Sequence, residues 1–133
     1  MLSFQPLISM TSPLAGGFLT GKLTGGDPLD GTRFEEGNMM GAFYKSMFDK
    51  PSMHSAVKKL QAVIKPQGIT LTEASLRWLV YHSALREGDG VTLGASKMLH
   101  LEDNTKDIAK GPLPDDVVEG MEEMWKTCKA DAP

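Results

Sequence analysis

The chain of 133 residues is long enough for one domain with its own core, and its composition, 41% hydrophobic and 23% charged, is that of an ordinary globular protein. A formal net charge of −3 gives no reason to expect nucleic acid or an acidic membrane surface as a partner. The single cysteine, Cys128, excludes a disulfide framework and favours the reducing cytosol, and no apolar run approaches the roughly 20 residues that span a bilayer.

The first predicted element is a short strand over residues 7–11, which ends at Ser12-Pro13. Glycines are dense from Gly16 to Gly41, and this density predicts a long loop with one helical turn in it. Loops of that length inside a compact domain are usually functional or disordered. The start of the chain carries no basic stretch followed by an apolar core, so we expect no signal peptide.

Two helices are predicted between residues 51 and 84. The first starts near Pro51, ends before Pro66 and keeps the i, i+3, i+4, i+7 spacing of one buried face. The second runs from a Thr72 N-cap to about Ala84 and is apolar over most of its circumference, so we expect it to be largely buried. The stripe of the first helix consists of Met53, Ala56, Val57, Leu60, Val63 and Ile64.

A second strand is predicted over residues 91–94, followed by two more helices. Ser96 is expected to cap the third helix, which carries Leu101, Thr105 and Ile108 on one side and ends at Gly111. The fourth begins around Pro114-Asp115 with the stripe Val117, Met121, Met124, Trp125 and Cys128. Strands separated by helices imply parallel pairing and an α/β architecture. Because two parallel strands leave two unpaired edges, the chain is expected to be part of something larger.

The segment Ser12–Lys22, SPLAGGFLTGK, places a glycine-rich turn directly after the first strand. Unshielded N–H groups at Gly16 and Gly17, with Lys22 nearby, would form an anion-binding concavity. The alternative is a plain surface loop, because the pattern matches neither the Walker-type nor the Rossmann glycine motif.

The segment Val91–Lys97, VTLGASK, leads from the second strand into a helix start, where backbone N–H groups favour a phosphate. His100 and Asn104 are four residues apart and are expected to share a helix face. The alternative is an ordinary cap with polar surface residues. Since both turns follow strand ends, where (β/α)₈ barrels carry their phosphate sites, together they favour a ligand site.

Five segments in this order resemble the C-terminal half of aldo-keto reductases, and are most similar to the aflatoxin-aldehyde reductase branch. They are SPLAGGFLTGK, GTRF, ASLRWLVYHSAL, VTLGASKMLHLEDN and GPLPDDVVEGMEEMW, which together cover roughly Ser12 to Lys126. The resemblance implies an α/β fold, the C-terminal part of a (β/α)₈ TIM barrel with strands seven and eight and their flanking helices. Residues 1–133 would form a single partial domain, incomplete as a barrel, with residues 1–11 as an atypical N-terminal segment.

The resemblance also implies an oxidoreductase with NADP(H) as cofactor and a small aldehyde or ketone as substrate. It places Ser12, Pro13, Leu14, Ala15 and Gly16 along the pyrophosphate, Lys22 and Arg33 at the phosphates, Gly94 and Ser96 at the adenosine 2′-phosphate, and Asp103 and Asn104 at the adenine. His100 stands where the family usually has Gln or Arg; a neutral His donates one hydrogen bond but lacks the charge of Arg.

The catalytic Asp, Tyr, Lys and His of the family belong to its N-terminal half, and nothing in this chain replaces them. Tyr44 falls in the variable loop and Tyr81 on a buried helix, while His54 and His82 are interpreted as structural. The chain alone is therefore expected to be inactive, and a homo-oligomer or a complementing chain is a possible partner. Two alternatives stay open, a non-catalytic regulatory partner similar to channel β-subunits and a gene fragment without function.

Overall fold

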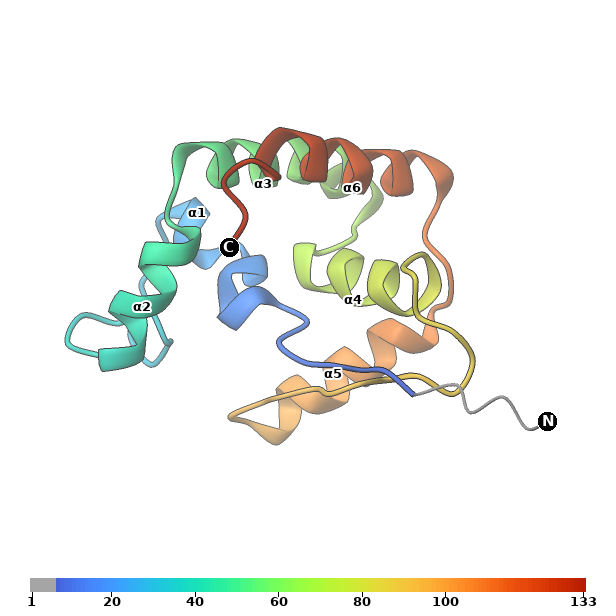
Figure 1. Ribbon diagram of the computed structural model, residues 1–133, viewed down its shortest axis with the longest axis horizontal. Helices are drawn as coiled ribbons and strands as arrows, with labels where there is room; N and C mark the ends of the chain where they lie inside the picture. The colour runs from blue at the N-terminus through green and yellow to red at the C-terminus, as the bar shows by residue number, and fades with distance from the viewer. Residues whose placement is uncertain (1–6) are drawn as a thin grey trace.

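A computed structural model describes residues 7–133, so the expectations for residues 1–6 lie outside the described residues. Figure 1 shows helices α3 (Pro51–Ile64) and α6 (Asp115–Cys128) side by side as one layer. Helix α4 (Leu71–Tyr81) lies beneath them, and α5 (Met98–Ala109) and the strands lie on the other side of α4. None of the described helices combines the length and the apolar character needed to cross a membrane.

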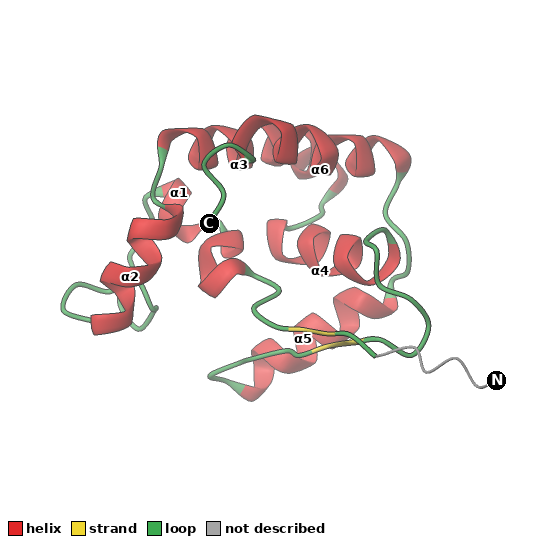
Figure 2. Ribbon diagram, in the orientation of Figure 1, coloured by secondary structure: helices red, strands yellow, loops and turns green. Residues whose placement is uncertain are grey.

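Strands β1 (Ser9–Met10) and β2 (Gly90–Val91) form a parallel two-stranded sheet, drawn as adjacent arrows in Figure 2. The amide of Gly90 donates to the carbonyl of Ile8 at 2.9 Å, and that of Thr92 to Met10 at 2.8 Å. The predicted parallel pairing is confirmed, but β2 begins one residue early and only Val91 of the predicted range is strand. The described residues thus form a mixed α/β structure that is mostly helical, as the predicted α/β class requires.

The largest interface joins α3 to α6, and both helices begin and end near the predicted residues. Gly120 lies on α6 where a Cβ atom would be 3.2 Å from Cδ1 of Leu60, so glycine lets the two helices approach closely. Trp125, predicted to lie in the buried stripe, is instead 54% exposed near the end of α6. The core cluster contains Phe18, Phe34, Met53, Ala56, Val57, Leu60, Ile64, Leu71, Ala74, Leu113, Val117, Met121 and Cys128.

Helix α4 starts and ends earlier than the sequence indicates. Thr70, rather than Thr72, is the N-cap, because its hydroxyl accepts a hydrogen bond from the amide of Glu73 at 3.0 Å. The helix ends before His82, whose Nε2 accepts a hydrogen bond from the amide of Leu113 at 2.9 Å. Only the first part of α4 is fully buried, and Tyr81 at its end is 40% exposed.

The glycine-rich segment contains more helix than the single turn that was predicted. It includes the 3-10 helix η1 (Ala15–Thr20), α1 (Lys22–Gly25) and, at its end, the ten-residue helix α2 (Met39–Phe48). Asn38 caps α2, since its side chain accepts hydrogen bonds from the amides of Met40 and Gly41 at 3.0 and 3.3 Å. Figure 1 shows α2 at one side of the molecule, away from α5.

Helix α5 packs mainly against α4. Its N-cap is Lys97, which provides no side-chain cap, so the predicted cap by Ser96 is wrong. The helix starts two residues beyond Ser96, and this places the Ser96 side chain ahead of the first turn. Leu101 and Thr105 are exposed, whereas Ile108 is half-buried.

Candidate functional site

The two predicted ligand loops leave the same end of the sheet. Strands β1 and β2 run parallel, with Met10 opposite Val91. The segments that lead to Ser12 and to Gly94 therefore leave the sheet at the same, carboxyl end of the two strands. The side-chain oxygens of Ser9 and Thr92 are 3.2 Å apart and join the two strands by a further contact. Figure 2 shows the first loop turning toward α4, while the second runs on before it returns as α5. The structure thus brings the starts of both loops together and lets them diverge beyond.

The start of β1 is fixed by Asp89, in the turn before β2. Its Oδ1 accepts a hydrogen bond from the amide of Ile8 at 2.8 Å, and its Oδ2 accepts one from the amide of Arg86 at 2.8 Å. These two amide donors, that of Ile8 first, hold the pKa of Asp89 below its usual value. The Asp89 carboxylate therefore ties the start of β1 to the turn before β2.

The turn after β1 has an unusual backbone. Ser12 and Ala15 adopt φ angles of +54° and +51°, and Gly16 and Gly17 adopt +65° and +99°. Such left-handed conformations are rare for residues with a Cβ and accumulate at functional sites. The half-buried Pro13 and Leu14 lie between these residues. The turn is therefore a defined part of the fold and not an irregular surface loop.

Several amides of this turn, including that of Gly17, are already hydrogen-bonded, whereas the amide of Gly16 donates to no backbone carbonyl in the described part of the chain. The amide of Ala15 donates to the carbonyl of Ser12 at 2.9 Å, and that of Gly17 donates to Leu14 at 3.0 Å. The amide of Leu19 also donates to Leu14, at 3.1 Å. The acceptors, Ser12 and Leu14, precede η1, and these three donors are therefore not available to an anion. Side chains near the turn would have to supply most of the charge for a phosphate.

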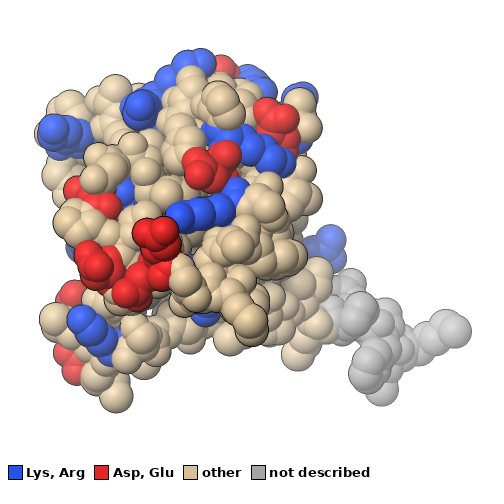
Figure 3. Space-filling view, turned by 90° about the vertical axis from the view of Figure 1, so that its left-hand side faces the viewer, with Lys and Arg blue, Asp and Glu red and all other residues tan. Residues whose placement is uncertain are grey.

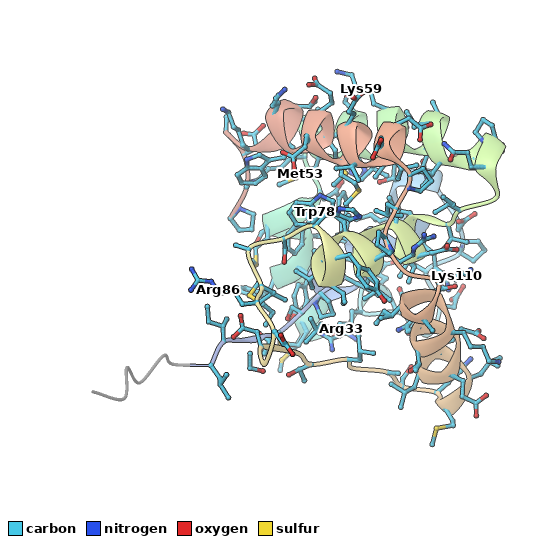
Figure 4. The ribbon with its side chains drawn as sticks, turned by 90° about the vertical axis from the view of Figure 1, so that its right-hand side faces the viewer. Arg33, Met53, Lys59, Trp78, Arg86 and Lys110 are labelled. Atoms are coloured by element: carbon cyan, nitrogen blue, oxygen red, sulfur yellow. The ribbon has the colours of Figure 1, made fainter. Side chains whose placement is uncertain are left out.

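Two such side chains follow the turn. Lys22 is exposed as the first residue of α1, and Arg33 is exposed in the loop before α2. The Nη1 of Arg33 donates to the hydroxyl of Tyr44 at 2.9 Å. Figure 4 shows Arg33 below α4, at the level of the strands. Lys22 and Arg33, the two predicted phosphate contacts, are therefore both accessible to solvent.

Helix α1, which presents Lys22, is held by a chain of three side chains. The hydroxyl of Thr24 and Nδ1 of His54 are 2.8 Å apart, and Nε2 of His54 lies 2.7 Å from Oδ1 of Asp49. The ring of His54 also packs edge-on against Phe18 at 5.5 Å. These contacts agree with the interpretation of His54 as structural.

The second loop carries the other predicted residues at different depths. Gly94, Ser96, His100 and Asp103 are exposed, whereas Asn104 is only 8% exposed. His100 and Asn104 lie one turn apart on α5, as predicted, but only His100 is exposed. The first turn of α5 has no side-chain cap, and such a helix start favours an anion.

The sequence analysis placed Tyr44 in the variable loop and did not assign it to the site, but the residue lies on α2. Its ring lies against Gly16 and its hydroxyl at Arg33, and so it joins two residues from the predicted site. The i, i+4 spacing of Tyr44 and Phe48 behind the Asn38 cap is the signal that could have placed it on a helix.

The remaining candidates for acid or base chemistry make structural hydrogen bonds. The hydroxyl of Tyr81 donates to the carbonyl of Ile108 at 2.7 Å, and His82 accepts from Leu113. Within residues 7–133 no group of three or more His, Cys, Asp or Glu side chains could hold a metal ion. The face in Figure 3 intersperses Lys and Arg with Asp and Glu and forms no continuous basic surface.

Comparison with known proteins adds an independent finding. The sequence model described as "Aldo/keto reductase family" matches residues 6–126, which is most of the chain. An aldo-keto reductase of Pseudocercospora fijiensis is 38% identical over 123 residues, covering 89% of this chain and 41% of that protein.

Two further relatives have more specific names. Aflatoxin B1 aldehyde reductase member 2 of Homo sapiens is 36% identical over 132 residues, covering 92% of this chain and 36% of that protein. Oxidoreductase sirO of Leptosphaeria maculans is 35% identical over 103 residues, covering 76% of this chain and 31% of that protein. The chain thus spans between about a third and two fifths of the length of these relatives.

Proposed function

Because the chain belongs to the aldo/keto reductase family, we propose that it is the C-terminal, NADP(H)-binding portion of an enzyme that reduces aldehydes or ketones to alcohols. One observation carries this proposal. The loops that begin at Ser12 and Gly94 leave the same end of two paired parallel strands, the end at which barrel enzymes of this type bind their ligands.

Side chains, more than the turn amides, would hold the phosphates. Lys22 and Arg33 are exposed cations after the first loop, and Arg33 can bind a phosphate through two parallel N–H donors. The uncapped start of α5 offers backbone donors to a second phosphate. We assign the pyrophosphate to the first loop and the adenosine 2′-phosphate to the second. Asp103 and Asn104 would contact the adenine, with the exposed His100 at the rim.

The cofactor supplies the hydride, and the protein supplies its position and a proton for the carbonyl oxygen. Tyr44 and Tyr81 both lie in structural hydrogen bonds, so we propose that the proton donor comes from outside this chain. The chain alone would then be inactive, and catalysis would require a complementing segment. The relatives reported above are reductases and an oxidoreductase, which favours this proposal over a regulatory partner. A cytosolic location fits the single cysteine.

Fluorescence titration with NADPH tests the proposal. We expect the full chain to bind NADPH with a dissociation constant above about 1 μM, because much of the pocket wall is missing. NADH is the matched control, since it lacks the 2′-phosphate and should bind more weakly. Equal affinities for NADH and NADPH would contradict the assignment of the second loop, and no binding of either nucleotide would contradict the proposal as a whole.

Arg33→Ala tests the first loop in the same titration. If Arg33 makes a charge-assisted bond to a phosphate, its loss should weaken NADPH binding by about 1.5–3 kcal/mol. Arg86→Ala is the matched control, because Arg86 lies in a different loop and points away from the protein in Figure 4. An unchanged dissociation constant for Arg33→Ala would remove Arg33 from the site. Reductase activity on co-expression with a matching N-terminal half would test the need for a complementing segment.

A further inference from the structure

The ring of Tyr44 covers the backbone of the turn after β1. A Cβ atom built on Gly16 would lie 2.5 Å from Cδ1 of Tyr44 and closer still to Cε1. Distances this short leave no space for a side chain at Gly16. The ring therefore rests directly on the turn that we assign to the pyrophosphate.

The ring is held there by other aromatic side chains. Tyr44 stacks on Phe48 with ring centroids 6.4 Å apart and an angle of 11° between their planes. Phe48 in turn stacks on the buried Phe18 of η1 at 5.6 Å and 17°. Because this column joins α2 to the turn, the hydroxyl of Tyr44 has a fixed position relative to Gly16.

Arg33 is placed by that hydroxyl. Its Nη1 donates to the Tyr44 oxygen at 2.9 Å, and its Cζ lies 5.4 Å from the centroid of the ring. No carboxylate of residues 7–133 pairs with Arg33. A guanidinium has five N–H donors, so one bond to Tyr44 orients the group and leaves the others for a ligand.

We propose that Tyr44 is a positioning residue for the dinucleotide phosphates, and that its hydroxyl orients the Arg33 guanidinium beside the Gly16 turn. This inference rests on the proposed function. Tyr44 acts only through Arg33 and contacts no reacting atom. Fixing Arg33 before the ligand arrives lowers the entropy that binding must remove, and this is how preorganisation raises affinity.

A double-mutant cycle in the full chain separates this role from a general effect on folding. The variants are Tyr44→Phe, Arg33→Ala and both together, and the measurement is the NADPH dissociation constant by fluorescence titration. Tyr44→Phe keeps the aromatic column and removes the hydroxyl alone. We expect it to weaken binding by about threefold to tenfold, the range of one neutral hydrogen bond. In the Arg33→Ala background the same change should have no effect.

Tyr81→Phe is the matched control, because it removes a different tyrosine hydroxyl, one bonded to Ile108 on α5. It should leave the NADPH dissociation constant unchanged. If the Tyr44→Phe variant binds NADPH as tightly as the unaltered chain does, the inference is overturned and the proposed function still stands. Tighter binding would also overturn it, since the hydroxyl would then compete with the phosphate for Arg33. If the unaltered chain binds neither NADPH nor NADH, both the proposed function and this inference are wrong.

Discussion

The guanidinium of Arg77 and the carboxylate of Glu73 form a buried ion pair on α4, with Nη1 2.6 Å from Oε1. The other donors of Arg77 reach the carbonyls of Gly111 and Pro112 at 2.7 and 2.6 Å. Glu73 also accepts a hydrogen bond from Lys110 at 2.8 Å, at the end of α5 in Figure 4. One buried pair thus joins α4 to the connection between α5 and α6.

Arg77→Met should be strongly destabilising, because it leaves the Glu73 carboxylate buried without its main partner. Breaking a buried ion pair in this way costs about 3–5 kcal/mol, and two carbonyls also lose their donor. Urea denaturation followed by circular dichroism would measure the loss. Lys110→Ala is the matched control, since the Lys110 side chain is 50% exposed and exposed pairs contribute under about 1 kcal/mol. Equal losses for the two variants would contradict the role of Arg77.

The attachment of β1 should weaken at low pH because of Asp89. Its pKa is depressed in the folded chain, chiefly by the amide of Ile8. The stability that it contributes is therefore present above its ordinary pKa and is lost as the pH falls through the folded value. Asp89→Ala should speed hydrogen exchange at the amides of Gly90 and Thr92, which pair with β1. Glu87→Ala, an exposed neighbour in the same turn, should leave both amides protected; similar exchange in the two variants would refute the prediction.

Much of the fold could be predicted from the sequence. The regular apolar spacing of α3 and the acidic start of α6 located both helices, because each buries one face in the same core. The order of strands and helices likewise predicted the parallel pairing of β1 and β2. Helix α2 was missed, since the glycines before it resemble a continuous loop and its cap depends on the single residue Asn38.

The chemistry of the first loop was harder to predict than its position. The glycines at residues 16 and 17 suggested free amides, but the amide of Gly17 donates to the carbonyl of Leu14, a bond that sequence spacing does not reveal. Arg33 lies in a loop, and Tyr44 lies eleven residues later on a helix that was not predicted. Such a contact can be predicted from sequence only when the positions of the loop and of the helix in the fold are already known.

Gly16→Ala should be more destabilising than the same change at Gly17. Both positions have positive φ, and this backbone conformation costs an alanine roughly 1–2 kcal/mol. At Gly16 the methyl group would also collide with the Tyr44 ring, whereas at Gly17 the nearest atom, of Phe34, is 3.8 Å away. Tyr44→Ala should therefore rescue part of the loss at Gly16 and none at Gly17, as measured by thermal unfolding. An equal response of both positions to Tyr44→Ala would show that the ring does not press on the turn.

Cys128 should make the protein less stable in alkaline solution. The thiol is 8% exposed at the end of α6, and burial raises its pKa. In the unfolded chain the thiol ionises near roughly pH 8.5, whereas the folded state disfavours the thiolate. The unfolded state therefore binds fewer protons above that pH, and the free energy of unfolding contributed by this group falls as the pH rises.

Cys128→Ser removes this titration, so the variant should show a flatter loss of stability than the unaltered chain from about pH 8 to about pH 10. As the chain contains one cysteine, labelling by a thiol reagent reports on Cys128 alone. Labelling should be slow in the native state and fast in urea, because the reactive thiolate is rare while the side chain is buried. Rapid labelling under native conditions, or identical alkaline slopes for the two proteins, would mean that the end of α6 opens far more readily than its packing against α3 indicates.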